Sequence, residues 1–140
     1  MTDRSAAREK RWVVLVSEDD ALMRMIMSDT LRDRGLEVIE EESAERAISR
    51  ISRRSDINLV VTDIQLAGEL SGLDLAHWIT ENRPEIRILA VSGFPRDVVG
   101  SSRPERYTFM SKPFSPSTLA REAFALLGET NEARRSVRNF

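Results

Sequence analysis

Residues 13–20 read VVLVSEDD, an apolar run that ends in three consecutive acids. A short continuous apolar run is typical of a strand that is covered on both faces, as in a parallel sheet. Glu18, Asp19 and Asp20 repel one another, so their position at the end of a strand needs a physical reason. Two reasons are open: the acids hold a cation, or they start a helix, whose N-terminal end favours negative charge.

Predicted strands and helices alternate along the rest of the chain. The predicted strands are residues 12–17, 36–40, 58–62, 86–91 and 107–110. The predicted helices start near Asp20, Ser43, Ser71, residue 95 and Ser115, and they end near Gly35, Arg53, Pro84, residue 101 and Gly128. This order predicts an α/β fold, a doubly wound five-stranded parallel sheet with helices on both faces. The strand at 36–40 is more polar than the others, so we expect it at an edge.

Local signals support the predicted helices. Ser71 and Asp74 have capping-box spacing, and Gly35 is a candidate left-handed cap. The apolar stripe of the first helix is predicted to comprise Met23, Ile26, Met27, Thr30 and Leu31. The stripe of the last helix is predicted to comprise Leu119, Ala123, Leu126 and Leu127.

Length and composition indicate one domain of 140 residues, with 41% hydrophobic and 31% charged residues. We expect a domain over residues 12–128, a polar N-terminal extension over 1–11 and a frayed polar tail over 129–140. A net charge of −2 predicts neither nucleic-acid nor membrane binding by bulk electrostatics. The chain has no Cys, which excludes disulfides and thiolate chemistry. Its apolar runs are far shorter than the roughly 20 residues of a membrane helix. We therefore expect a cytoplasmic protein.

Chemically active residues follow four of the predicted strands. Glu18 and Asp19 follow the first strand, Asp63 the third, Ser92 the fourth and Lys112 the fifth. In a parallel sheet these positions meet at the carboxyl edge, where ligands bind. Clustered carboxylates need a compensating cation, and oxygen ligands favour Mg²⁺. The sequence therefore predicts a magnesium site that contains the first three of these side chains, whereas Asp20 is expected only to start the helix.

Beside a metal ion, the Asp63 carboxylate could act as a nucleophile toward phosphorus. The Ser92 hydroxyl and the Lys112 ammonium could then bind phosphoryl oxygens. Lys112 is one of two lysines in a chain with 19 arginines, and its compact charge differs chemically from a planar guanidinium.

With these residues in place, the chain resembles the receiver domain of two-component response regulators over roughly residues 12–127. The resemblance rests on VVLVSEDDALMR, LVVTDIQLAGELSGLDL, ILAVSG and FMSKPF, which occur in this order and each at a strand end. It implies a (βα)5, flavodoxin-like fold with strand order 2-1-3-4-5. It also implies that Asp63 accepts a phosphoryl group from the phosphohistidine of a histidine kinase.

The resemblance implies further roles for single residues. Asp19 would bind Mg²⁺ directly and Glu18 through water, with Asp63 and the backbone carbonyl of Gln65 as further ligands. Ser92 corresponds to the switch hydroxyl and Lys112 to the lysine of the family. Phe109 corresponds to the switch aromatic residue. The peptide bond between Lys112 and Pro113 would be cis, which only X–Pro bonds adopt at low cost.

The sequence also departs from the family. Ala67 stands where a proline is usual, and the segment between Gly68 and Gly72 is one residue longer than the commonest pattern. Ser17 replaces a usual aliphatic residue. These differences remove no chemical group of the site, but they leave the conformation of the loop after Asp63 open.

The predicted function is that of a single-domain response regulator and not of a turnover enzyme. Phosphorylation would switch a partner-binding surface or relay the phosphoryl group. The expected partners are a sensor histidine kinase or histidine phosphotransfer protein and a downstream protein, with a phosphorylation-dependent homodimer as a further candidate. No direct nucleic-acid or membrane partner is expected.

Three alternatives stay open. The chain could be the receiver piece of a hybrid kinase. It could be an aspartate-nucleophile phosphatase, although that chemistry needs a second Asp where Gln65 stands. A flavodoxin-like cofactor binder would need a phosphate-binding loop where the acids of SEDD repel phosphate. His77, in the middle of a predicted helix, is expected to be a surface or core-edge residue and not a phosphoryl carrier.

Overall fold

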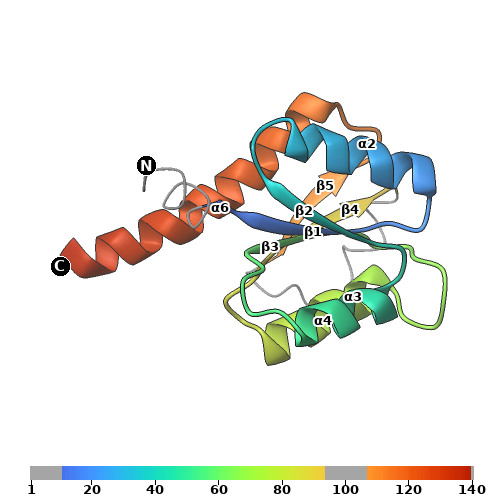
Figure 1. The fold of residues 1–140 in the computed structure, drawn as a ribbon, viewed down its shortest axis with the longest axis horizontal. Coiled ribbons are helices and arrows are strands. Elements are labelled where there is room, and N and C mark those ends of the chain that lie inside the picture. The colour runs from blue at the N-terminus through green and yellow to red at the C-terminus, as the bar shows by residue number, and fades with distance from the viewer. Residues whose placement is uncertain (1–10, 94–106, 140) are drawn as a thin grey trace, which may run out of the picture.

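The computed structural model describes residues 11–93 and 107–139 and forms three layers (Figure 1). A five-stranded sheet lies in the middle, and all neighbouring strands are parallel, in the order β2-β1-β3-β4-β5. Helices α2 and α6 cover one face of the sheet, and α3 and α4 cover the other. The predicted fold class and strand order are confirmed.

The strands are β1 (Val13–Ser17), β2 (Glu37–Glu41), β3 (Leu59–Asp63), β4 (Arg87–Ser92) and β5 (Tyr107–Ser111). The helices are α2 (Ala21–Arg32), α3 (Ala44–Ser52), α4 (Gly72–Asn82) and α6 (Pro116–Asn139). Each strand begins and ends within one residue of its predicted position. The helix predicted over residues 95–101 lies outside the described residues.

Strand β1 is apolar from Val13 to Val16 because helices cover both faces of the sheet. Val13 and Leu15 belong to the core between the sheet and the α3–α4 layer. Val14 and Val16 belong to the core between the sheet and the α2–α6 layer. Successive side chains of a strand point to opposite faces, so a strand covered on both faces has a near-continuous run of apolar residues.

The helix starts are fixed by the side chains that the sequence indicated. Asp20 is the N-cap of α2 and accepts hydrogen bonds from the backbone N–H groups of Leu22 and Met23. Ser43 caps α3, and Ser71 and Asp74 form a complete capping box at the start of α4. Gly35 follows α2 with φ of 91°, the left-handed conformation that a side chain would disfavour.

Two predictions about helices are wrong. Ile26 is 42% exposed, because the buried stripe of α2 is centred on Met27, Thr30 and Leu31 and leaves Ile26 at its margin. The last helix does not end at Gly128, and residues 129–139 continue α6 beyond the body of the domain (Figure 1). Gly128 has no positive φ, and a glycine inside a helix costs only about 1 kcal/mol, too little to end it. Within the described residues, no helix is long and apolar enough to cross a membrane.

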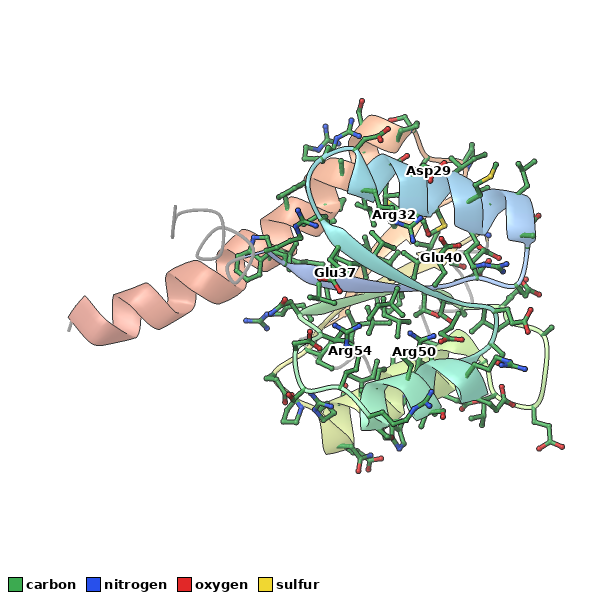
Figure 2. The ribbon with its side chains drawn as sticks, in the orientation of Figure 1. Asp29, Arg32, Glu37, Glu40, Arg50 and Arg54 are labelled. Carbon is green, nitrogen blue, oxygen red and sulfur yellow. The ribbon has the colours of Figure 1, made fainter. Side chains whose placement is uncertain are left out.

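Edge strand β2 carries acids that pair with arginines of the flanking segments (Figure 2). Glu37 lies 3.3 Å from Arg54, Glu40 lies 2.9 Å from Arg32, and Glu41 lies 2.8 Å from Arg50. Charged side chains on an edge strand oppose pairing with strands of other molecules. The polar character of this strand thus fits its edge position, as predicted.

Candidate metal and phosphoryl site

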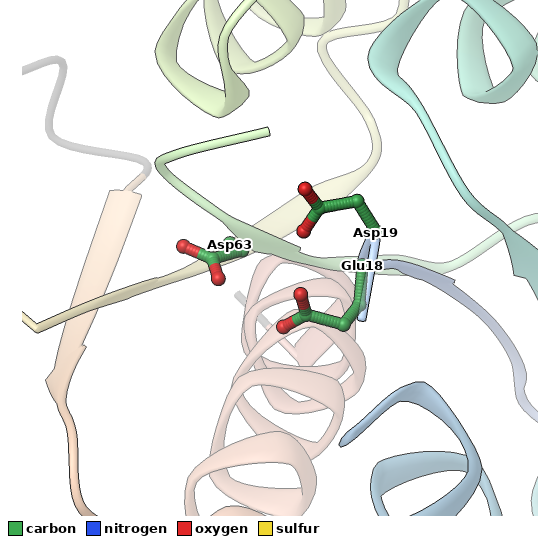
Figure 3. Close-up of side chains that lie close together, drawn as sticks. All are labelled: Glu18, Asp19 and Asp63. Carbon is green, nitrogen blue, oxygen red and sulfur yellow. The ribbon is translucent and has the colours of Figure 1, made fainter. Parts of the chain in front are cut away.

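Three carboxylates meet at the carboxyl edge of the sheet. Glu18 and Asp19 follow β1, and Asp63 is the last residue of β3. Strands β1 and β3 are hydrogen-bonded neighbours, with Ser17 paired to Thr62, so their ends lie side by side. One carboxylate oxygen from each of the three acids lies within 4.8 Å of the others (Figure 3). The fold therefore brings together the three acidic side chains that the sequence assigned to one site.

Glu18 is the buried member of this acidic cluster, with 2% of its surface exposed. Its Oε2 accepts a hydrogen bond of 3.1 Å from the backbone N–H of Asp20, whereas its Oε1 is buried and has no hydrogen-bond partner among the described residues. Burial raises the pKa of Glu18 from 4.5 to about 7, and the charge of Asp63 adds to the rise. A buried carboxylate oxygen without a partner is a group that a cation would satisfy, so the cluster fits Mg²⁺.

Asp63 is 6% exposed, and both of its carboxylate oxygens are engaged. Oδ1 accepts a hydrogen bond of 3.0 Å from the backbone N–H of Gln65. Oδ2 accepts one of 2.5 Å from Nζ of Lys112, which also lies 3.8 Å from Oε1 of Glu18. Burial lowers the pKa of Lys112, but the hydrogen bond and the negative charge of Asp63 outweigh it, so the pKa is raised. The Lys112 ammonium therefore neutralises part of the charge of the cluster.

Ser92 and Phe109 lie on the strands beside Asp63. Ser92 is the last residue of β4, is 4% exposed, and its carbonyl accepts a hydrogen bond of 2.8 Å from the backbone N–H of Lys112. Phe109, on β5, is half-buried and packs against a small cluster of Ile64 and Ala90. The peptide bond between Lys112 and Pro113 is cis, as the resemblance implies.

The remaining candidates lie at the margin of the site or away from it. Gln65 is exposed and lies two residues after the end of β3, and its backbone N–H donates a hydrogen bond to Oδ1 of Asp63. His77 is exposed on α4, which agrees with its expected place on a helix surface.

Two residues contact the backbone of the acidic cluster, a role that the sequence did not assign to them. Arg24, on α2, donates a hydrogen bond of 2.7 Å to the carbonyl of Glu18, and its Nε lies 3.5 Å from Glu40. Gly72, the first residue of α4, lies so close to Asp63 that a Cβ there would be 1.9 Å from the Asp63 carbonyl oxygen. In the sequence, Arg24 has the pattern of an ordinary surface arginine, whereas the spacing of Gly72 from Asp63 is a visible signal.

The β3–α4 loop, residues 64–71, contacts two carboxylates that come from other parts of the chain. The backbone N–H of Ala67 donates a hydrogen bond of 3.2 Å to Oδ2 of Asp19. Glu45, in the first turn of α3, accepts hydrogen bonds of 3.2 Å from the N–H groups of both Glu69 and Leu70. The sequence shows Glu45 only as a helix-start acid, so these contacts could not have been found from it.

Comparison with known proteins agrees with this fold and geometry. Residues 14–124 match the response regulator receiver domain family. The chain is 31% identical over 124 residues to the chemotaxis protein CheY1 of Helicobacter pylori J99, and the match covers 85% of this chain and 98% of that protein. It is 29% identical to the response regulator receiver protein CpdR of Brucella abortus, with 81% and 95% covered. The match to the transcriptional regulatory protein PdtaR of Mycobacterium tuberculosis, at 30% identity, covers 84% of this chain but only 57% of that protein.

Solved structures show the same architecture. NtrX of Brucella abortus, at 28% identity, superposes with a TM-score of 0.83 over 93% of this chain and 30% of that chain. A receiver protein of Sinorhizobium medicae, at 24% identity, superposes with a TM-score of 0.80 and covers 87% of this chain and 98% of that chain. The strand order and the superpositions show a flavodoxin-like receiver fold. The chain belongs to the response regulator receiver domain family.

Proposed function

We propose that the chain is a phosphorylation-dependent signalling switch in which Asp63 accepts a phosphoryl group from a phosphohistidine. The observation that carries the proposal is the position of Asp63, buried at a strand end between an acidic cluster and the Lys112 ammonium. A carboxylate that only stabilised the fold would not need two further acids beside it. A nucleophile that must receive a charged phosphoryl group needs cations close by.

The residues of the site divide the chemistry between them. One oxygen of Asp63 attacks phosphorus, the bond from phosphorus to the donor's imidazole nitrogen breaks, and its electron pair returns to the ring. The Lys112 ammonium donates a hydrogen bond to Asp63 and can pair with a phosphoryl oxygen. Glu18, Asp19, Asp63 and the backbone carbonyl of Gln65 would hold Mg²⁺, which when bound neutralises charge on the phosphoryl oxygens.

The switch would use the residues on β4 and β5. In this proposal, the Ser92 hydroxyl turns to a phosphoryl oxygen, and Phe109, which packs against Ile64 and Ala90, moves as the β4–β5 surface rearranges. The altered surface then binds a downstream protein or a second copy of the chain. Because the phosphoryl group stays on the protein as a signal, the chain acts as a switch and not as a turnover enzyme.

The proposed donor is a sensor histidine kinase or a histidine phosphotransfer protein, and the chain itself is proposed to act in the cytoplasm. Helix α2 begins directly after the acids and exposes three large apolar side chains, Leu22, Met25 and Ile26, with 62%, 49% and 42% of their surfaces accessible. An apolar helix face beside the reacting carboxylate suits a histidine-bearing helix, which must bring its phosphoryl group to Asp63.

A second candidate is that the chain is a receiver unit of a larger kinase. This candidate is favoured by a match to the sensor kinase CckA of Brucella abortus at 30% identity, which covers 76% of this chain and 12% of that protein. The chemistry proposed for Asp63 is the same in both cases, and only the output differs.

The test is to incubate the protein with Mg²⁺ and acetyl phosphate and to measure the intact mass. We expect a gain of one phosphoryl group that is lost in Asp63→Asn and kept in Asp33→Asn, which alters an exposed aspartate at the end of α2. The double variant Glu18→Gln/Asp19→Asn should bind no Mg²⁺ by calorimetry. No mass gain in the wild type, or a gain that survives Asp63→Asn, contradicts the proposal.

A further inference from the structure

The β3–α4 loop connects the metal ligand Asp19 to a glutamate outside the site. Asp19 is exposed, and a free aspartate side chain at such a position would sample several rotamers. In this structure its Oδ2 accepts a hydrogen bond from the N–H of Ala67 while a carboxylate oxygen of the same residue lies within 4.8 Å of the ligand oxygens of Glu18 and Asp63. The rotamer that the loop holds is therefore the rotamer that completes the acidic cluster (Figure 3).

The hydrogen bond from Ala67 depends on a backbone group that one residue type lacks. Every amino acid except proline carries a backbone N–H, so a proline at this position could not make the contact with Asp19. A monodentate metal ligand uses one carboxylate oxygen, which leaves the second free for an outer hydrogen bond. Such outer contacts fix the orientation of metal ligands.

Glu45 fixes the far side of the same loop. Its Oε2 accepts hydrogen bonds from the N–H groups of both Glu69 and Leu70. Between these contacts and Ala67 lies Gly68, with φ of 108°. A Cβ at Gly68 would lie 3.2 Å from Oε1 of Glu45, so the loop is packed closely against the glutamate. The carboxylate of Glu45 therefore shapes the turn that presents the Ala67 N–H to Asp19.

We propose that Glu45 is a positioning residue for the metal site, acting through the β3–α4 loop and the Ala67 N–H on the Asp19 carboxylate. This inference rests on the proposed binding of Mg²⁺ by Glu18, Asp19 and Asp63. The coupling is reciprocal, so a metal ion that fixes Asp19 also steadies the loop and its contacts with α3. The hydrogen bonds between the loop and the start of α3, which lies outside the acidic cluster, are thus stronger when the metal site is filled.

The test measures Mg²⁺ affinity by calorimetry, together with hydrogen exchange at the amides of Glu69 and Leu70. In the wild type, Mg²⁺ should slow exchange at both amides. Glu45→Ala should weaken Mg²⁺ binding by about tenfold, the lower range seen for outer-shell partners of metal ligands, and should speed exchange. Glu45→Gln should keep both the Mg²⁺ affinity and the slow exchange of the wild type. A single oxygen of Glu45 accepts both hydrogen bonds, and the side-chain amide of Gln retains one such oxygen.

Four further variants separate positioning from charge and from general loss of stability. Glu42→Ala removes an equal charge from an exposed glutamate just before α3 and should leave Mg²⁺ affinity unchanged. Ala67→Pro removes the N–H and should weaken Mg²⁺ as Glu45→Ala does, whereas Ala67→Gly, which keeps the N–H, should weaken it much less. The double variant Glu45→Ala/Ala67→Pro should lose no more affinity than either single variant, since both interrupt one connection.

The outcomes distinguish this inference from the proposed function. If the wild type binds no Mg²⁺, the proposed metal site is wrong and the inference fails with it. If the wild type binds Mg²⁺ and Glu45→Ala binds it equally well, the positioning role alone is wrong. Equal losses in Glu45→Gln and Glu45→Ala would show that only the charge of Glu45 acts, which also overturns positioning.

Discussion

Nζ of Lys112 lies 2.5 Å from Oδ2 of Asp63, at the point where strands β3 and β5 end on either side of β4. The same ammonium lies 3.8 Å from Oε1 of Glu18. In the metal-free protein Lys112 thus supplies the positive charge that the carboxylates require. A divalent cation that binds to the acidic cluster would therefore lie close to the Lys112 ammonium, which is hydrogen-bonded to Asp63.

Removing this ammonium should therefore increase the affinity for Mg²⁺. We expect Lys112→Met to bind Mg²⁺ about tenfold more tightly, because the cation no longer experiences repulsion from a charge a few ångströms away. Lys112→Arg keeps the charge and should bind Mg²⁺ much as the wild type does, although its planar fork cannot replace the compact ammonium in contacts with the phosphoryl group. Calorimetric titration at low ionic strength checks both values. Weaker binding by Lys112→Met would show that the lysine supports the metal site and does not compete with the ion.

The raised pKa of Glu18 predicts how the stability of the metal-free protein depends on pH. Its folded pKa of about 7 lies above the ordinary 4.5, so between these values the folded state binds more protons than the unfolded state. The contribution of this pKa shift to the free energy of unfolding is complete below pH 4.5 and is lost as pH rises through 7. At 1.36 kcal/mol per pKa unit, the full loss is on the order of 3 kcal/mol.

Urea unfolding without divalent cations, at pH 5 and at pH 8, measures this loss. The wild type should have a smaller free energy of unfolding at pH 8, and Glu18→Gln, which cannot ionise, should show a much smaller difference. The lowered pKa of Asp56 affects only more acidic solutions, so it does not confuse this comparison. A pH dependence that is identical in the wild type and in Glu18→Gln would mean that the buried carboxyl is not its source.

The apolar face of α2 predicts a difference between protein and small-molecule phosphodonors. Replacing Leu22 and Met25 together with serine should slow phosphotransfer from a cognate histidine kinase by tenfold or more, since each exposed side chain would lose roughly 1–2 kcal/mol of contact. Phosphorylation by acetyl phosphate needs no docking surface and should stay unchanged. Phe124→Ser, on the exposed surface of α6, is the matched control. Equal slowing with both donors would point to damage in the site and would contradict docking on α2.

The principal residues of the site could be predicted from the sequence because each of them ends a strand or closely follows one. Strand positions shifted by one residue in several predictions, but Asp63 and Ser92 remained at strand ends. The parallel sheet then brings Asp63 next to Glu18 and Asp19, and this does not depend on the conformation of the loops.

The supporting contacts could not be predicted, because their hydrogen-bond donors are backbone groups. Ala67, Glu69 and Leu70 contribute N–H groups that every residue but proline carries, so nothing in their side chains indicates Asp19 or Glu45 as the acceptor. The continuation of α6 was missed for a different reason. Gly128 has the sequence signature of a helix end, but its backbone keeps a helical conformation with no steric conflict.

Gly72 and Gly128 make a matched pair for the last prediction, since both lie in helices and only one is crowded. A Cβ at Gly72 would lie 1.9 Å from the carbonyl oxygen of Asp63 and 2.8 Å from Cα of Ile64, so the backbone at the end of β3 would have to move. We expect Gly72→Ala to lower the free energy of unfolding by about 3 kcal/mol, the upper end of the usual cost of overpacking. It should also impair phosphorylation in the molecules that remain folded.

At Gly128 a Cβ would meet no atom of the described part of the chain within 4 Å. Alanine there restricts the unfolded chain and suits the helix, so Gly128→Ala should raise the free energy of unfolding by roughly 0.5–1 kcal/mol and leave phosphorylation unchanged. Denaturant unfolding of both variants, with the mass assay for phosphorylation, checks the pair. If Gly72→Ala unfolds like the wild type, the start of α4 is not held against Asp63 in solution. If Gly128→Ala is destabilised, residue 128 ends its helix in a left-handed cap, and the extension of α6 to Asn139 is not the conformation in solution, because alanine is penalised only where φ is positive.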